Sequence, residues 1–593
     1  MRATTCGGDR PISSSCSLRG CNTGLSPIIA SAASPPSASS SPGHLRKPTV
    51  NRLLPSLATL AAAALLLTGC AAGTPDSSSA NPVRGGTLVY ASGDAEPTCL
   101  DPHVGGNYPQ ALVASQYLES LVSKDKAGKI IPWLATKWTE SADGLSWDFT
   151  LKKGVKFTDG TPLTSEAVVA NVAHLQDPKT ASSTGYLALQ KVTKVTAVDN
   201  LTARIDLSAP DSALLDSLSQ TWLAIESPTA LKRTQAVNCE SPVGTGPFVV
   251  TKWNHQQSIE LTRNDSYNSP PADAAHSGPA YLKAIEWRFL PDSASRYAAV
   301  QSGTVDVIDN VQPDTIIAAE KQKNLVVVDA PRPGASNRIE LNSSITPFDD
   351  EKVREAFIRS ADVSGAITSL FFDTTKRSYS PLSSVEKDGY SEPKLFDYDQ
   401  KAAAKLLDEA GWTQKNADGY RVKDGKVLEL DFPVSTNQSI PAEQSLFEQL
   451  QATTKQAGFK VDLHPLDLSS WYGALGENHY NLVSAPYTKV GPDVLRILFD
   501  SAGTKPAPSG YFANHAQIND PALDTLLENA AESSDAAKRS ADYKKAQQIV
   551  LEGYYILPLY DQQNHYLLST KLTGFRAMPT VSTPTLYDAW LSR

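Results

Sequence analysis

The chain has 593 residues, of which 41% are hydrophobic and 20% charged, a mixture that can form a large buried core and argues against a wholly disordered protein. Its 54 basic and 63 acidic residues give a formal net charge of −9. Residues 1–69 hold six of the basic residues and one acidic residue, which leaves 48 and 62, a net of −14, for residues 70–593. A nucleic-acid partner is not expected, because such binding needs a cationic surface.

The first part of the chain has the pattern of a secretion signal. Arg46, Lys47 and Arg52 precede an apolar run over 53–67, which is short for a helix that spans a bilayer. Residues 1–44 lie ahead of any basic segment of this kind, so we expect translation to begin near residue 45 or 50. We assign 1–69 to an N-terminal extension plus a lipoprotein signal peptide.

The apolar run ends in Leu67-Thr68-Gly69-Cys70, which resembles the bacterial lipobox. That resemblance implies acylation of the Cys70 thiol and cleavage before it. Acyl chains contribute about 0.8 kcal/mol per buried methylene, so Cys70 would anchor the protein to the cell membrane outside the cytoplasm. The Ser- and Pro-containing stretch 70–82 then predicts a flexible tether. The alternative is a chance cysteine after a buried helix.

Two cysteines, Cys99 and Cys239, remain after the tether. An even pair in an oxidising compartment favours a disulfide. Two separately buried thiols are the alternative.

Residues 84–166 predict mainly strands and turns. Residues 84–90 predict an opening strand, and alternating Trp147, Phe149 and Leu151 predict another. Gly154 and Asp159-Gly160 predict turns, and Thr164-Ser165-Glu166 predicts the start of a helix.

The second half alternates helices and strands. Residues 399–410 predict an amphipathic helix, and an Asp424-Gly425 turn predicts a hairpin over 420–432. Residues 443–456 predict a helix, with its N-terminal cap within 435–437 and its end at Gly458. A strand over 459–463 is expected to follow it. Strand–helix–strand units of this kind imply an open α/β sheet.

No catalytic or cofactor motif is evident in the sequence. It lacks a Gly-x-Ser-x-Gly elbow, a His-Glu-x-x-His pair, a phosphate-binding loop ending in Gly-Lys-Ser/Thr and a Cys-x-x-Cys pair. Its nine histidines are scattered, without the spacing of a helical zinc motif. We therefore expect no enzyme activity, no cofactor and no metal site.

A long ordered series of motifs resembles family 5 extracellular solute-binding proteins, the peptide- and nickel-binding subunits of ABC importers. The series covers nearly the whole chain after the tether, and one departure from the family pattern is Ala167, where Asp is usual. Its members are the segments 132–138, 143–164, 243–248, 263–267, 300–306, 347–357, 405–412 and 557–560.

The resemblance implies a two-lobed α/β fold of the periplasmic-binding-protein type II class, with an extra subdomain in lobe I and two crossovers. Lobe I would comprise 83–328 and the return segment 560–593, and lobe II would comprise 329–559. Cys99 and Cys239 would both lie in lobe I. The protein would be a monomer that binds a small peptide-like solute and delivers it to ABC permease and ATPase subunits.

The resemblance also implies which segments line the cleft. They are the loop after the first strand, the stretch after the crossover and loops of lobe II. The residues that we expect to contact the ligand are Asp101, His103, Asn342, Asn437, Gln438, Tyr487, Thr488 and Lys489, with Trp222, Trp253 and Trp471 as possible apolar walls. For each tryptophan the alternative is core packing, and for Asn437 it is helix capping.

One departure bears on the ligand. Peptide-binding members carry an Asp that pairs with the α-ammonium of the ligand, where this chain has Thr488 or Lys489. Loss of a charge-assisted hydrogen bond costs roughly 1.5–3 kcal/mol, so a solute with a blocked amine or an anionic group is favoured. An oligosaccharide or metal-chelate receptor, and a sensor lipoprotein without a transport role, remain alternatives.

Overall fold

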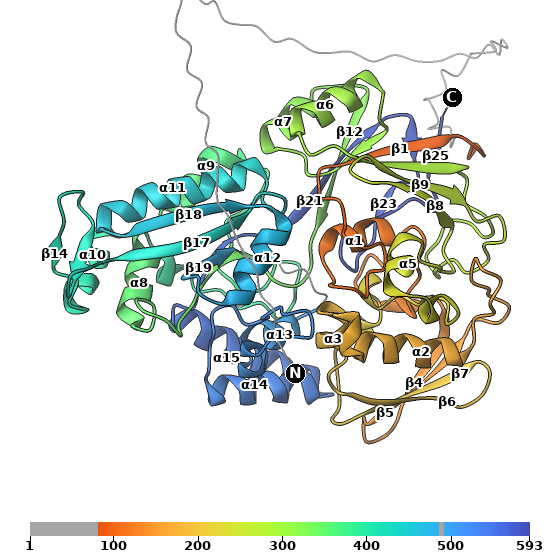
Figure 1. The fold of residues 1–593 in the computed structure, drawn as a ribbon, viewed down its shortest axis with the longest axis horizontal. Coiled ribbons are helices and arrows are strands. Elements are labelled where there is room, and N and C mark those ends of the chain that lie inside the picture. The colour runs from red at the N-terminus through yellow and green to blue at the C-terminus, as the bar shows by residue number, and fades with distance from the viewer. Residues whose placement is uncertain (1–80, 485–490, 593) are drawn as a thin grey trace, which may run out of the picture. The chain divides into compact units, whose positions relative to one another are not determined.

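The largest sheet of the protein brings together strands from both ends of the chain (Figure 1). The computed structural model describes residues 81–484 and 491–592. β1 is the central strand of this sheet and pairs in parallel with β10 and β11, whereas the other pairs are antiparallel. In sheet order the strands are β12 (Leu325–Pro331), β21 (Gln563–Ser569), β11 (Val307–Ile308), β1 (Thr87–Ser92), β10 (Ala284–Phe289), β9 (Ser258–Arg263) and β8 (Phe248–Asn254).

Helices α6 and α7 pack on this sheet, and other short helices lie in the connections between its strands. A close approach of backbone to backbone explains Gly244 and Gly246, because a Cβ at either position would lie within 2.7 Å of the Tyr117 backbone. The α-helices are α1 (Tyr108–Ala114), α4 (Leu214–Ser217), α5 (Gln235–Glu240), α6 (Ser293–Ser302) and α7 (Pro313–Ala319). The single-turn 3₁₀ helices are η2 (Thr221–Leu223) and η3 (Ala230–Lys232).

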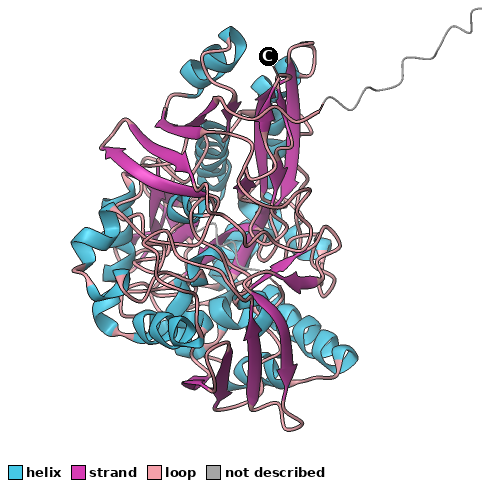
Figure 2. Ribbon diagram, turned by 90° about the vertical axis from the view of Figure 1, so that its right-hand side faces the viewer, coloured by secondary structure: helices cyan, strands magenta, loops and turns pink. Residues whose placement is uncertain are grey.

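A separate four-stranded antiparallel sheet lies at the lower edge in Figures 1 and 2, with helices beside it. Trp147, Phe149 and Leu151 point to its buried side, as their alternation predicts, and helix α2 packs on β6 and β7. The strands in sheet order are β4 (Ala135–Glu140), β5 (Ser146–Leu151), β7 (Thr202–Leu207) and β6 (Val192–Ala197). The adjoining helices are α2 (Ser165–Gln176), η1 (Pro178–Thr180) and α3 (Thr184–Ala188).

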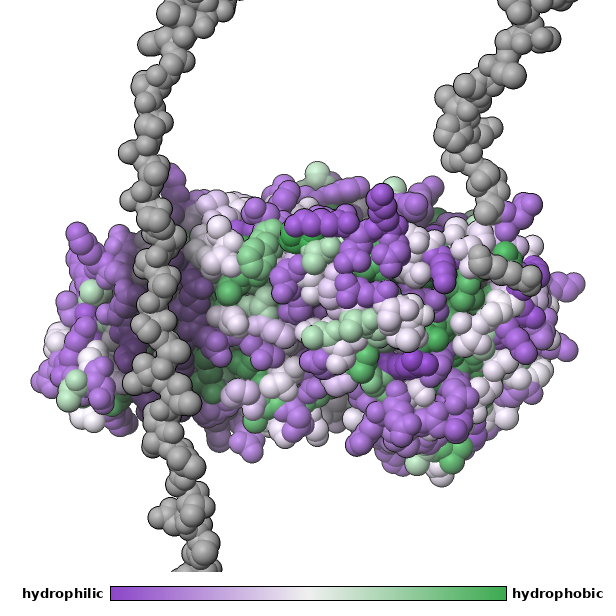
Figure 3. Space-filling view, turned by 90° about the horizontal axis from the view of Figure 1, so that it is seen from above, coloured by the Kyte–Doolittle hydropathy of each residue, from purple (hydrophilic) through white to green (hydrophobic). Residues whose placement is uncertain are grey.

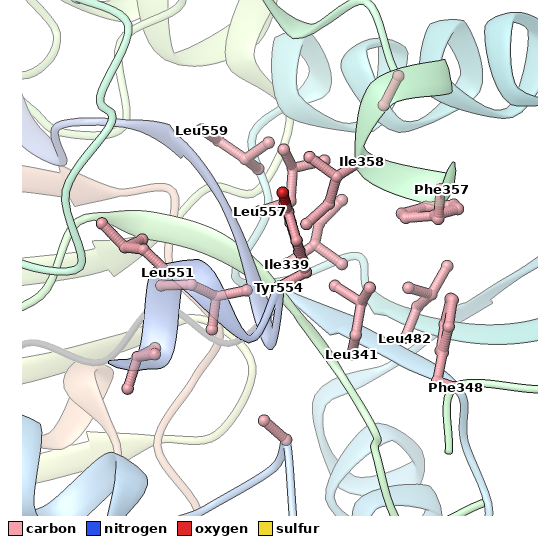
Figure 4. Packing of buried hydrophobic residues seen from close by; sticks show 14 of the residues in the cluster. Ile339, Leu341, Phe348, Phe357, Ile358, Leu482, Leu551, Tyr554, Leu557 and Leu559 are labelled. Atoms are coloured by element: carbon pink, nitrogen blue, oxygen red, sulfur yellow. The ribbon is translucent and has the colours of Figure 1, made fainter. Parts of the chain in front are cut away.

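A second core is built on different strands and on the longest helices. Ile339, Leu341, Phe357 and Leu557 are at most 1% exposed and meet between strands β13 and β20 and helix α8 (Figure 4). The strands are β19 (Leu482–Ser484), β13 (Asn337–Leu341) and β20 (Ile556–Tyr560), beside the parallel pair β17 (Glu429–Ser435) and β18 (Lys460–Leu466). The helices are α8 (Glu351–Ser360), α9 (Val363–Phe371), η4 (Pro393–Phe396), α10 (Gln400–Glu409), α11 (Pro441–Ala457), α12 (Leu468–Glu477), α13 (Val494–Phe499), η5 (Ser501–Thr504), α14 (Pro521–Glu532) and α15 (Ala536–Glu552).

The chain passes twice between the part built on the seven-stranded sheet, called the first core, and the second core. The first passage follows Pro331, at the end of β12, and the second lies between Tyr560 and Gln563, where β20 ends and β21 begins. The first sheet therefore extends to 331, a few residues past the expected boundary at 328.

Two local expectations about the second core were wrong. The strand expected over 426–432 is interrupted at Leu428, because 426–427 pair with β15 and 429–435 pair with β18. Asn437 does not cap α11, whose N-cap is Ile440, and instead accepts a hydrogen bond from the Leu468 backbone N–H at 3.0 Å.

The remaining strands form small ribbons. They are β2 (Val122–Lys124) with β3 (Ile130–Pro132), β14 (Gln414–Lys415) with β15 (Arg421–Lys423) and β16 (Lys426–Val427), β22 (Leu572–Thr573) with β25 (Trp590–Leu591), and β23 (Arg576–Ala577) with β24 (Pro584–Thr585). Among the described residues, no helix combines the length and apolarity that a membrane crossing requires. The face in Figure 3 mixes hydrophilic residues with small hydrophobic patches.

The expected disulfide is present. Cys99 and Cys239 are bonded, with Cα atoms 4.4 Å apart. The bond links the loop after β1 to the end of α5.

Candidate functional site

A cavity of about 760 Å³ lies between segments that belong to the two cores. From the first core come the loops 94–98 and 105–109 together with Trp222. From the second come Asn437 and Gln438, much of α12 and the loop 509–511. All of these residues belong to one compact unit, 79–593.

The start of α1 forms one wall of the cavity. Asn107 is the N-cap, and it exchanges hydrogen bonds with Gln110 in a capping box, which fixes the entry of the chain into the helix. The Trp222 indole N–H donates to the Asn107 backbone carbonyl at 2.9 Å, and the ring is 3% exposed. The capping box and the indole therefore hold this wall in place.

Helix α12 forms the opposite wall. Its N-cap, Asp467, accepts hydrogen bonds from the backbone N–H groups of Ser469 and Ser470. The Trp471 indole N–H donates to the Pro433 carbonyl at 3.3 Å, and the ring is 2% exposed. Because a backbone carbonyl already satisfies this N–H, Trp471 offers the cavity an apolar surface.

Charged side chains of both signs border the cavity. Arg332 is the one cation among the described lining residues, and its guanidinium stacks on the Tyr108 ring at 4.1 Å. The Arg332 Nε is buried and has no hydrogen-bond partner within 81–484 and 491–592. Three carboxylates, Asp94, Glu96 and Asp467, lie on the same lining.

Asp94 has the most perturbed acidity of these carboxylates. Its pKa is raised to about 7, first by removal from water and second by the nearby Asp309 carboxylate, which together outweigh the lowering effects of Asn310 and Arg332. Near neutral pH Asp94 therefore changes charge readily when a charged group enters the cavity.

The residues expected to contact a ligand divide into three groups. Trp222, Asn437 and Trp471 line the cavity, and so does Gln438. Tyr487, Thr488 and Lys489 lie outside the described residues, as does Cys70.

The third group lies away from the cavity lining. Trp253 belongs to it, and its indole N–H donates to the Glu96 carboxylate at 2.6 Å. Asn342 is fully buried, donates to the Tyr480 carbonyl and accepts from Ser344. Asp101 and His103 are at most 1% exposed and interact with each other and with neighbouring segments. The sequence suggested these two because they follow the first strand, but the chain turns inward before it reaches them.

Several lining residues were not anticipated. Asp94 and Glu96 come directly after β1, and Arg332 comes directly after β12. Ligands of open α/β sheets bind outside the carboxyl ends of strands, so the position immediately after each strand was the signal that could have identified them. Tyr108, Tyr472 and Tyr511 also line the cavity.

The comparisons with known proteins agree with this architecture. The Glutathione-binding protein GsiB of Shigella flexneri is 27% identical over 495 residues, covering 81% of this chain and 90% of that protein. The structure of DppA from Helicobacter pylori in complex with the peptide STSA superposes with a TM-score of 0.75 at 23% identity, covering 86% of this chain and 99% of DppA. MoaA from A. tumefaciens R10 in complex with mannopinic acid gives a TM-score of 0.75 at 24% identity, covering 86% of this chain and all of MoaA.

These structural relatives establish a two-lobed α/β fold of the type II periplasmic-binding-protein class. Lobe I denotes the part that contains the seven-stranded and four-stranded sheets, and lobe II denotes the second core. Residues 129–508 match the family described as "Bacterial extracellular solute-binding proteins, family 5 Middle". Because that match covers more than half of the chain, the protein belongs to the family 5 extracellular solute-binding proteins of ABC importers.

Proposed function

We propose that this protein captures a peptide or peptide-like solute in the cavity between its lobes and passes it, chemically unchanged, to the permease of an ABC transporter. The observation that carries the proposal is the cavity of about 760 Å³ with walls from both lobes, a volume within the roughly 300–1,000 Å³ of small-molecule sites. A solute that contacts both walls favours the closed arrangement through its higher affinity for that state.

The charges around the cavity suit a zwitterionic solute. Arg332 presents a guanidinium stacked on Tyr108, which is suited to a carboxylate of the ligand. Asp94, Glu96 and Asp467 offer carboxylates for an ammonium group. A free amine is therefore acceptable even with a lysine at position 489, and the glutathione and peptide ligands named for the relatives fit this pattern.

The test is binding to defined solutes. Purified protein is titrated calorimetrically with glutathione and with tri- and tetrapeptides, and the bound solute is then recovered and its mass measured. Micromolar or tighter binding with recovery of the intact solute supports the proposal. Cleavage of the solute, or binding to none of these compounds, contradicts it.

A second candidate is a sugar-derived acid. Five aromatic side chains line the cavity, and aromatic faces stack well on sugar rings; they are Tyr108, Trp222, Trp471, Tyr472 and Tyr511. The mannopinic acid complex of MoaA is consistent with this chemistry on the same fold. Mannopinic acid that displaces bound peptide, or that binds when no peptide does, would favour this candidate.

We also propose that the protein is exported and held at the cell membrane by acylation of Cys70. The supporting pattern is the basic segment and short apolar run that precede Leu67-Thr68-Gly69-Cys70. A Cys70→Ala variant should appear in the soluble fraction while the parent protein remains with membranes. An equal distribution of both proteins would contradict anchoring at this residue.

A further inference from the structure

A cluster of metal-ligating side chains, two of them fully buried and one partly buried, lies in lobe I outside the solute cavity. Asp101, His103 and His174 each offer one ligand atom, and these atoms all lie within 4.8 Å of one another. Asp101 and His103 belong to the loop after β1, whereas His174 belongs to the last turn of α2. Because the ligands come from distant parts of the sequence, spacing alone could not reveal the cluster.

The outer contacts of both imidazoles determine which ring nitrogen carries the proton. His103 Nε2 lies 2.8 Å from the Ala224 carbonyl oxygen, which can only accept, so Nε2 carries the hydrogen. The Thr180 hydroxyl donates to the His174 carbonyl at 2.6 Å and therefore accepts from His174 Nδ1 at 3.3 Å. The opposite nitrogens, His103 Nδ1 and His174 Nε2, are thus left with bare lone pairs.

Both bare nitrogens face the Asp101 carboxylate. His103 Nδ1 lies 3.8 Å from Asp101 Oδ1, and His174 Nε2 lies 3.6 Å from Oδ2. Neither nitrogen has a hydrogen-bond partner in the part of the chain that the structure describes, although His103 is fully buried. Lone pairs of three acceptor groups therefore converge with no donor among them, which is costly in a buried site and is relieved by a cation.

The dimensions suit a zinc ion. Tetrahedral zinc with bonds of about 2.0–2.1 Å to nitrogen and oxygen places neighbouring ligand atoms roughly 3.4 Å apart. The two nitrogen–oxygen separations, which involve different oxygens of Asp101, exceed this value by a few tenths of an ångström. All three ligand atoms lie within 4.8 Å of one another, so binding of the ion would draw the side chains closer together. Each histidine already donates its other N–H to an oxygen, which is the usual outer support of a zinc-bound imidazole.

The surroundings hold the carboxylate in position. The Asn238 side-chain amide donates to Asp101 Oδ2 at 3.0 Å and to Glu226 Oε2 at 2.7 Å, so two buried carboxyl groups lie side by side. The Cys99–Cys239 disulfide joins the segments that carry Asp101 and Asn238. The Asp101 carboxylate, beside two imidazole nitrogens that have no hydrogen-bond partner among the described residues, favours a cation.

We propose that Asp101, His103 and His174 form a structural zinc site, with water or a further protein oxygen as the fourth ligand. The site braces one wall of the solute cavity. Gln110 in α1 donates to the Cys99 and Val104 carbonyls, so the metal-binding loop and the cavity-lining start of α1 are held together.

The test uses the intact, disulfide-bonded protein, freed of metal by EDTA and carrying no affinity tag. Calorimetric titration with ZnCl₂ should show one tight site per chain. In His174→Gln the affinity should fall by at least about 100-fold, since even the loss of an outer support costs 10- to 100-fold. His174 is the better position to vary, because its side chain is 18% exposed whereas His103 is fully buried.

The matched control is His464→Gln. His464 also lies beside two aspartates, Asp431 at 2.9 Å and Asp462 at 3.4 Å, but on the surface. This variant should bind zinc as the parent does. Absence of tight zinc binding to the parent, or equal binding by His174→Gln, would overturn the proposal.

A second measurement does not depend on the folding of a variant. Anomalous diffraction at the zinc edge from crystals of the zinc-loaded parent should place a peak between His103 and His174. A peak elsewhere, or none, would overturn the assignment.

Discussion

Gly473 offers a way to fill the solute cavity without disturbing the core. It is the sixth residue of α12, lines the cavity, and has space for a Cβ with no atom within 4 Å. In Gly473→Trp the added indole would enter the space that a solute needs. Because glycine is disfavoured in helix interiors by about 0.5–1 kcal/mol relative to alanine, we expect neither Gly473→Ala nor Gly473→Trp to lower the melting temperature.

The loss of affinity can be worked out from buried area. An indole covers roughly 200 Å². With about half of it packed against the cavity walls, its burial stabilises the solute-free variant by about 2.5 kcal/mol at 25 cal/mol per Å². A solute must overcome this stabilisation to bind, which corresponds to about 50- to 100-fold in Kd. Gly473→Ala adds one methyl group and should change Kd by only a few-fold.

The assay combines thermal melting with recovery of bound solute from a defined peptide mixture, quantified by mass spectrometry after removal of free peptide. Lys544→Trp, which places an indole on the exposed face of α15, is the matched control and should retain binding. If Gly473→Trp melts normally and binds solute as the parent does, the α12 wall is not part of the binding site.

Three further perturbations test the scaffold and the site. Replacing Cys99 and Cys239 by alanine opens a cross-link between residues 140 apart, which should lower the unfolding free energy by about 5 kcal/mol on the chain-entropy estimate; reductant should match this loss in the parent and leave the double variant unaffected. Burial raises the pKa of Glu119 to about 7 despite hydrogen bonds from four side chains, so the folded state holds this proton more tightly than the unfolded state, and stability should fall by about 3 kcal/mol as the pH rises from about 4.5 to 7. In Glu119→Gln, the unfolding free energy measured in urea should fall less steeply with pH across that range than in the parent. An unchanged pH dependence would show that Glu119 is not the titrating group. Arg332→Gln should weaken binding of a solute carboxylate by roughly 10- to 100-fold with little effect on a matched amidated solute, and equal losses for both would contradict a direct carboxylate contact.

Much of the fold was accessible from sequence because it is encoded in local patterns. The alternation of Trp147, Phe149 and Leu151 gave a buried strand, and Gly458 ended α11 at a φ of +112°. The break at Leu428 was not accessible, because two partner strands from different parts of the chain divide that segment between them.

The site was accessible only in part. Trp222 and Trp471 were identified as possible walls because large aromatic rings near the expected cleft are suited to that role, and both line it. Asp101 and His103 were placed by distance along the chain from β1, but the turn that carries them inward depends on contacts with Asn238 and Ala224, far away in sequence. Arg332 could have been identified only through its position directly after β12, where the chain passes between the lobes.

The central claim is that one small solute is enclosed between the lobes and leaves unchanged. Native mass spectrometry of the intact protein after incubation with the peptide mixture tests it most directly. The account predicts one adduct per chain with the mass of an unmodified solute, released intact on denaturation and missing from Gly473→Trp. An adduct of altered mass, several adducts of equal strength on one chain, or the same adduct on Gly473→Trp would contradict it.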